Sequence, residues 1–141
     1  MIRAKGWSSL CLASLVLAGC QLDSRQQVLA VGASQVQLRQ FQSRQFETGD
    51  RERVLRAVIA TLQDLGFVVD KADPVLGTIS GTKLDGYALR MTVTTIPRGT
   101  DRVVVRANAQ YNLEAVEEPL PYQQFFAALE KSLFLAAQNV D

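Results

Sequence analysis

The chain contains no histidine, and it has few other residues that support chemistry. Only two of its 141 residues are cysteines, four are prolines and one is a tryptophan. Without imidazole, the Ser-His-Asp and Cys-His catalytic arrangements are excluded, as are metal sites that need a histidine ligand. No glycine-rich phosphate loop occurs either. We therefore expect a protein that is not an enzyme and that needs neither a metal nor another cofactor.

The first twenty residues have the three parts of a secretory signal. Arg3 and Lys5 form a short basic region, an apolar stretch runs from Leu10 to Leu17, and Ala18-Gly19 supply small residues. The apolar stretch is shorter than the ~20 residues that a membrane-spanning helix needs. We predict that residues 1–19 are a signal peptide that is removed.

A cysteine stands directly behind this signal. Leu17-Ala18-Gly19-Cys20 resembles the lipobox of bacterial lipoproteins. The resemblance implies that the Cys20 thiol takes a diacylglycerol and that Cys20 becomes the first mature residue, anchored by two or three acyl chains. Gln21 follows where an aspartate commonly marks inner-membrane retention, which favours the periplasmic face of the outer membrane. The alternative is an ordinary secreted protein or a short membrane-anchored one.

The mature chain is predicted to be one nearly neutral domain on a tether. Removing the signal leaves 141 − 19 = 122 residues and a net charge of 13 − 14 = −1, since the signal carries two basic residues. This charge favours no nucleic-acid partner. Cys11 leaves with the signal and Cys20 is lipidated, so no disulfide forms. We expect residues 20–34 to be the lipidated cysteine and a flexible tether, and residues 35–141 to form the domain.

The first half of the domain is predicted to hold a strand, a helix and a hairpin. Apolar and polar residues alternate along residues 35–46, with one break in the alternation at Phe41. This pattern is typical of a strand with a bulge or a frayed end. Apolar residues then recur at helical spacing between a cap at Thr48 and a stop at Gly66. Two strands follow, one over residues 67–73 and a returning one over residues 77–83.

The second half is predicted to add two long strands and a final helix. Strict alternation places Met91 and Val93 on one face and Arg90 on the other, and a second strand over residues 102–111 repeats the pattern. The last helix has an apolar stripe made by Tyr122, Phe125, Phe126, Leu129, Leu133 and Ala136. The order β-α-β-β-β-β-α predicts an α+β two-layer sandwich, with both helices on one face of an antiparallel sheet.

The middle of the chain resembles a known family. The stretch from Val58 to Lys83, "VIATLQDLGFVVDKADPVLGTISGTK", is similar to the repeated domain of the BamC family, outer-membrane lipoproteins of the β-barrel assembly machinery. The resemblance implies a helix-grip fold and the role of an accessory lipoprotein. This chain has one such domain where the family has two and a long extended N-terminal segment, so the family's specific partner is not implied.

The polar face of the predicted sheet carries a group of basic residues. Arg90, Arg102 and Arg106 alternate with threonines and asparagine, and Lys83 is expected nearby. The nearest acids lie in predicted turns. These residues are candidates for binding an anionic head group, a glycan or an acidic partner surface. The alternative is that they only keep an exposed face soluble.

Two other places are candidates for contact with a partner. Phe134 lies off the apolar stripe of the last helix, which predicts a partner contact or the lining of an apolar groove. Arg39 and Arg44, with the glutamines around them, could form a strand edge open to strand addition, or an ordinary edge with polar protection.

These features favour an outer-membrane-anchored periplasmic lipoprotein that acts as a non-catalytic accessory or adaptor subunit of an envelope complex, of a barrel-assembly or an export or efflux type. Its partners would be the membrane, through its acyl chains, and an envelope protein. The alternative is a carrier of lipid or of another small ligand, which needs a cavity between the last helix and the strand from Tyr87 to Val93. A third possibility is an enzyme built on Ser80, Lys83 and an acid.

Overall fold

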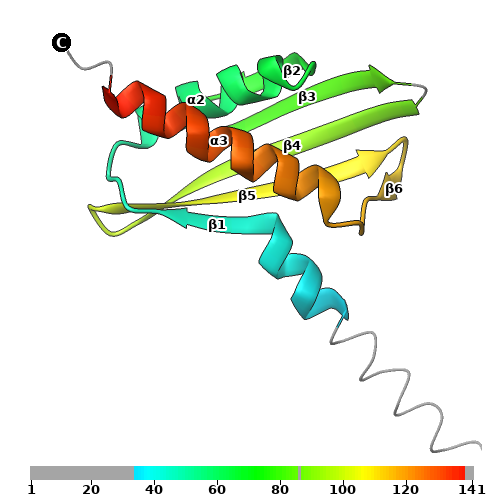
Figure 1. Cartoon of the computed structure of the whole chain (residues 1–141), viewed down its shortest axis with the longest axis horizontal. Coiled ribbons are helices and arrows are strands. Elements are labelled where there is room, and N and C mark those ends of the chain that lie inside the picture. The colour runs from blue at the N-terminus through cyan, green and yellow to red at the C-terminus, as the bar shows by residue number, and fades with distance from the viewer. Residues whose placement is uncertain (1–33, 86, 139–141) are drawn as a thin grey trace, which may run out of the picture. The chain divides into compact units, whose positions relative to one another are not determined.

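Two helices cover one face of an antiparallel sheet (Figure 1). The computed structural model describes residues 34–85 and 87–138, and the compact unit discussed below is Gln37–Asp141. Its elements are β1 (Ser43–Phe46), α2 (Arg51–Asp64), β2 (Val68–Asp73), β3 (Thr78–Asp85), β4 (Tyr87–Arg98), β5 (Arg102–Tyr111), β6 (Glu114–Ala115) and α3 (Leu120–Gln138). The predicted α+β sandwich is confirmed, with the short strand β6 added before the last helix.

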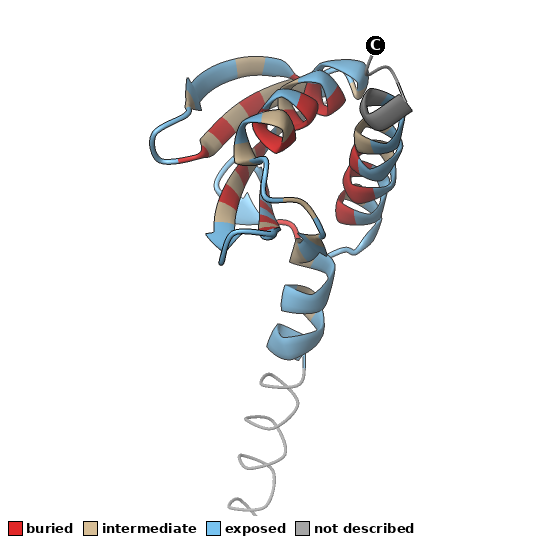
Figure 2. Cartoon of the chain, turned by 90° about the vertical axis from the view of Figure 1, so that its left-hand side faces the viewer, coloured by how far each residue is buried: buried red, intermediate tan, exposed pale blue. Residues whose placement is uncertain are grey.

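The sheet has one buried and one open face. Its strand order is β1-β5-β4-β3-β2, with β6 also paired to β5, and every pair is antiparallel. The inner face, toward the helices, buries Met91 and Val93 of β4 and Val103, Val105 and Ala107 of β5 (Figure 2). Because side chains alternate along a strand, the residues between these form the outer face, which neither α2 nor α3 covers.

The first predicted strand is only partly correct. Strand β1 is limited to Ser43–Phe46, and residues 34–42 are helical. This segment contains four glutamines, one leucine and one arginine, which have high intrinsic helix propensity. The break in parity at Phe41 is therefore the end of a helix and not a bulge in a strand.

Gly66 terminates helix α2 as predicted, but the N-terminal cap lies two residues after the predicted one. The Asp50 carboxylate accepts a hydrogen bond from the Arg53 N–H at 2.9 Å, which makes Asp50 the cap. The Thr48 hydroxyl instead accepts from the Asp50 N–H at 3.2 Å and shapes the turn before the helix. At the other end Gly66 has φ +85°, and the Phe67 N–H donates to the Leu62 carbonyl at 2.9 Å, which closes a Schellman motif.

Helix α3 supplies the largest side chains of the core. Tyr122, Phe125, Phe126 and Leu129 are buried as the apolar stripe predicted, and Leu133 is half-buried. The Ala136 side chain lies outside the described residues. The rings of Phe125 and Phe126 meet edge to face, with centroids 5.2 Å apart. These aromatic side chains fill the space between α2, α3 and the inner face of the sheet, so the core is held by packing.

The Tyr122 hydroxyl completes the edge of β5. Strands β1 and β6 pair with the same side of β5 at different positions and leave a gap between them. The fully buried Tyr122 Oη accepts from the Ala109 N–H at 3.2 Å and donates to the Val116 carbonyl at 2.7 Å. The Gln42 side chain donates to the same oxygen at 3.3 Å. A side chain thus satisfies backbone groups that would otherwise be buried without partners.

A buried hydroxyl in α2 gives a first prediction about stability. Thr61 is 1% exposed, and its Oγ1 has no hydrogen-bond partner among the described residues. Because the buried hydroxyl loses its hydration without compensation, Thr61→Val should raise the free energy of unfolding by about 1 kcal/mol in urea titration. Thr95 is the matched control, since its buried Oγ1 donates to the Gly77 carbonyl at 3.2 Å. Thr95→Val should lower the same quantity, and equal effects of the two substitutions would contradict this account.

Candidate interaction surfaces

The outer face of the sheet gathers four arginines. Arg90 and Arg98 belong to β4, and Arg102 and Arg106 to β5; all four are exposed. The register places Arg98 directly opposite Arg102 and Arg106 opposite Thr94. Arg90, Arg102 and Arg106 therefore share one face, as predicted. Arg98 was not among the predicted residues, because a proline such as Pro97 usually ends a strand, whereas β4 continues through it.

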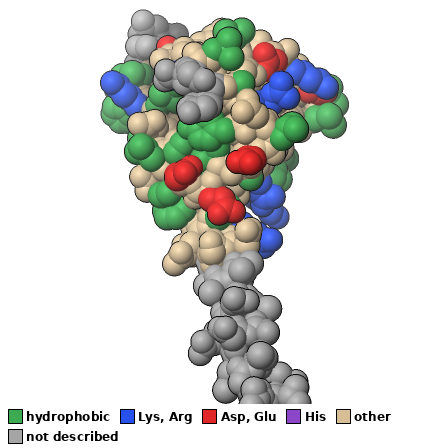
Figure 3. Space-filling view, turned by 90° about the vertical axis from the view of Figure 1, so that its right-hand side faces the viewer, with side chains coloured by type: hydrophobic (Ala, Val, Ile, Leu, Met, Phe, Trp, Pro, Cys, Tyr) green, Lys and Arg blue, Asp and Glu red, His purple; other side chains and the backbone are tan. Residues whose placement is uncertain are grey.

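Most side chains around these arginines are short and polar, apart from the apolar pair Ile96 and Val104 between Arg102 and Arg106. The outer positions of β3, β4 and β5 carry hydroxyl and amide groups at Thr78, Ser80, Thr82, Thr92, Thr94, Asn108 and Gln110. Among the outer positions that the structure describes on these three strands, none is an acid. The nearest carboxylates lie at the margins and already have partners: Asp70 accepts from the Thr82 hydroxyl, and Asp101 lies 3.4 Å from the Arg102 Nε. In Figure 3 basic side chains lie on both sides of the domain, with more of them on the right.

Lys83 does not join this group. Lys83 lies opposite Leu89 on the inner face. Every second residue of β3 points to this face, and the buried Ile79 and Gly81 belong to the same set. Its side chain lies beside Gly66, within 4 Å of the position that a Cβ would take there. The ammonium group is therefore placed near the C-terminal end of α2, where it complements the helix dipole. The prediction of Lys83 on the polar face was wrong, since Gly81 carries no side chain that reveals the parity of β3.

The enzyme hypothesis required Ser80 near Lys83. The two residues lie on opposite faces of β3, and the Ser80 hydroxyl is hydrogen-bonded to the Thr92 hydroxyl at 3.1 Å. A nucleophile–base pair between them does not form. Among the described residues, no group of three or more acids, histidines and cysteines is placed to hold a metal ion.

The two arginines of the predicted first strand are not an open docking edge. Arg39 lies in the helical segment 34–42. Arg44 is on the inner-face parity of β1, with its guanidinium 5.1 Å above the Phe126 ring and 2.6 Å from the Glu130 carboxylate. This cation–π contact and ion pair attach β1 to α3. Strand β1 is an edge strand, as predicted, but it is only four residues long, and neither arginine lines an open edge of it.

Phe134 lies beside a groove on the helical side of the domain. The ring is 64% exposed and stands off the buried stripe, as the helical periodicity predicted. The groove, with a volume of about 320 Å³, is lined by Phe46, Glu47, Thr48, Arg53, Leu133 and Phe134. Arg53 Nη2 donates to the Leu133 carbonyl at 3.3 Å and so fixes one wall. We call these six residues the Phe134 groove.

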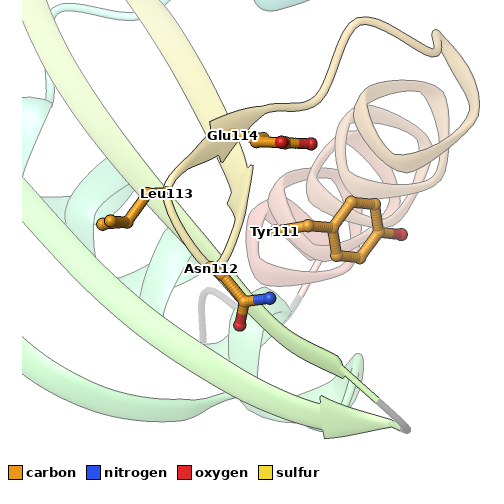
Figure 4. Close-up of a pocket in the computed structure, with 4 residues that line it drawn as sticks. All are labelled: Tyr111, Asn112, Leu113 and Glu114. Atoms are coloured by element: carbon orange, nitrogen blue, oxygen red, sulfur yellow. The ribbon is translucent and has the colours of Figure 1, made fainter.

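Two other hollows differ greatly in size. A shallow one of about 600 Å³ lies at the turn between β5 and β6, lined by Tyr111, Asn112, Leu113 and Glu114 (Figure 4). Tyr111 was predicted on the buried face but is 37% exposed, because it is the last residue of β5. The cavity where helices and sheet meet, beside Met91 and Lys83, holds only about 60 Å³. That is room for roughly two water molecules.

Comparison with known proteins adds no relative. The chain matches no protein-family model, and a search of curated proteins found no match. Within the described part of the chain, no helix is both long and apolar enough to cross a membrane. What the domain does therefore has to be argued from its surfaces.

Proposed function

We propose that this protein is a lipid-anchored accessory subunit of an envelope complex, held at the periplasmic face of the outer membrane, and that it binds without catalysis. The anchor is Cys20, in the context Leu17-Ala18-Gly19-Cys20, and Gln21 behind it favours the outer membrane. The outer face of the sheet and the Phe134 groove are the contact surfaces of the anchored domain.

The observation that carries this proposal is the open, basic outer face. Arg98 and Arg102 stand directly opposite each other, so their like charges repel, and the exposed Asp101 carboxylate 3.4 Å from the Arg102 Nε offsets this repulsion only in part. Guanidinium groups form bidentate hydrogen bonds with carboxylates and phosphates, and the neighbouring hydroxyls add further donors. The face is thus suited to a surface that presents several anionic groups at once.

The Phe134 groove supplies the second contact. An exposed aromatic ring beside a groove of about 320 Å³ can hold a hydrophobic side chain of a partner protein. Two modest contacts suffice, because anchoring the chain in the same membrane as its partner raises the effective concentration. A carrier, in contrast, needs several hundred cubic ångströms between helix and sheet, and the cavity of about 60 Å³ gives that alternative no support.

In-cell photo-crosslinking tests this proposal. A probe at Phe134 should give one discrete protein adduct, whereas a probe at Gln63, exposed on α2, is the matched control and should give none. Reversing Arg90, Arg102 and Arg106 to glutamate should lower the adduct yield at least tenfold, because the two contacts act together. Adducts with lipids or small molecules alone would favour the carrier. Absence of a protein adduct, with no effect of the charge reversal on envelope integrity, would refute the adaptor role.

A further inference from the structure

An apolar corner lies on the outer face next to an arginine. Val68 of β2 pairs with Thr82 of β3, and Thr82 pairs with Arg90 of β4, so these three side chains form one row across the sheet. Leu84 is two residues beyond Thr82 and shares its face. Val68 is 71% and Leu84 83% exposed. We call Val68 and Leu84 the apolar corner.

From this arrangement we propose that the outer face is a membrane-contact surface: its arginines bind the phosphates of anionic phospholipids, and the apolar corner enters the head-group layer. The inference rests on the proposed function, since it names the anionic surface that the sheet face contacts. The Phe134 groove on the helical side then remains free for the protein partner.

The spacing of the arginines favours a phospholipid layer over a small anionic ligand. Arg90 and Arg98 are eight residues apart on β4, which is about 26 Å along a strand. One phosphate reaches only one or two of the arginines, whereas a plane of phosphates contacts all four. Each basic residue near an anionic bilayer strengthens binding roughly fivefold.

The apolar corner favours a bilayer over an acidic protein surface. An aliphatic side chain beside a guanidinium matches the boundary between acyl chains and head groups, where surface-bound segments place Leu or Val next to Arg. An acidic protein surface offers no apolar layer beneath its charges. The bilayer therefore offers Leu84 and Val68 burial at the same depth at which it offers phosphates to the arginines.

The predicted anchor at Cys20 would keep the domain close to the bilayer. About 14 residues separate Cys20 from Ser34, and a flexible chain of that length spans on the order of 20 Å. At that distance even weak contacts between the arginines and phosphates are occupied.

The acids that border the contact already have partners, Asp70 the Thr82 hydroxyl and Asp101 the Arg102 guanidinium, and three further acids lie at the β6 turn. Glu114, Glu117 and Glu118 are exposed in and after β6. At this turn, Leu113 points away from Tyr111 and Glu114 in Figure 4. Leu113 is 93% exposed but has acidic neighbours and no arginine beside it in the sheet register, which makes it a matched control for Leu84.

Vesicle co-sedimentation tests the proposal on the mature chain, residues 20–141 carrying Cys20→Ser. It should bind vesicles of equal parts phosphatidylglycerol and phosphatidylcholine, and bind pure phosphatidylcholine at least tenfold more weakly. Replacing Arg90, Arg98, Arg102 and Arg106 with glutamine should weaken binding at least a hundredfold, and Leu84→Ser about tenfold. The controls Arg56→Gln, on α2, and Leu113→Ser should change it less than twofold.

Two results would overturn the membrane contact: equal binding to both kinds of vesicle, or no binding to either. Equal losses for Leu84→Ser and Leu113→Ser would likewise remove the apolar corner from it. Inorganic phosphate, at matched ionic strength, should compete no better than chloride, and specific competition would replace the bilayer with a phosphate ligand. If vesicles are not bound while the Phe134 probe still gives its protein adduct, the membrane contact is wrong and the proposed accessory role stands.

Discussion

Gly77→Ala is expected to lower the free energy of unfolding by roughly 3–4 kcal/mol, a large part of the stability of a domain of this size. Gly77 lies in the turn before β3 with φ +72°, where an L side chain is strained. An added Cβ would stand 2.7 Å from the Thr95 Oγ1 and 2.8 Å from the Thr95 carbonyl, and it would overlap the Arg51 guanidinium. The arginine can move, but the carbonyl cannot.

The environment of Gly77 explains why relaxation is costly. Its carbonyl accepts from the Thr95 N–H at 2.8 Å and from the Thr95 hydroxyl at 3.2 Å. Arg51 donates to Thr95 Oγ1 at 3.4 Å and to the Val75 carbonyl at 3.1 Å, so the same turn also holds the start of α2. A shift of this turn therefore disturbs contacts between the helix, β3 and β4.

Urea denaturation measures the effect, and Gly99→Ala is its control. Gly99 has nearly the same backbone conformation, φ +68°, but the nearest atom to an added Cβ is Asp101 Oδ1 at 3.6 Å. Gly99→Ala therefore introduces only backbone strain and should lower the free energy of unfolding by about 1 kcal/mol. If the two substitutions lower the free energy of unfolding equally, close packing around Gly77 is not the cause.

Cys20→Ser is expected to abolish membrane association and incorporation of radiolabelled palmitate completely. The substitution removes the thiol that the lipobox resemblance assigns as the acylation site, and serine cannot form the thioether. Cell fractionation and palmitate labelling measure the two effects. Cys11→Ser is the control, since Cys11 lies within the predicted signal and its loss should leave both unchanged. A membrane-bound, labelled Cys20→Ser protein would show that the lipoprotein assignment is wrong.

Strict alternation and helix caps made most of the fold predictable. The two faces of β4 and β5 follow from Met91, Val93, Val103 and Val105, and the end of α2 follows from Gly66. These patterns are local, and each is repeated over several residues. The prediction was wrong where a short apolar pattern allowed two structures, as in residues 34–42.

The candidate surfaces were harder to predict because they depend on strand register. The shared face of Arg90, Arg102 and Arg106 could be predicted, since it requires only the alternation of apolar and polar residues within two clear strands. The face of Lys83 was not, because Gly81 conceals the parity of β3, and Arg98 required knowing that β4 continues past Pro97. The pairing of Arg44 with Glu130 joins residues 86 positions apart and has no local sequence signal.

The divided edge of β5 has a consequence for lateral crowding. Proteins anchored in one membrane leaflet meet their own copies often, and an unbroken strand edge invites them to pair into fibrils, for which segments of about six residues are needed. Here four residues of β1 and two of β6 are separated by the Tyr122 hydroxyl, and the opposite edge strand, β2, has an irregularity between Val69 and Lys71. Neither edge presents a long regular template, which would limit polymerisation if the domain is concentrated on a membrane as we propose.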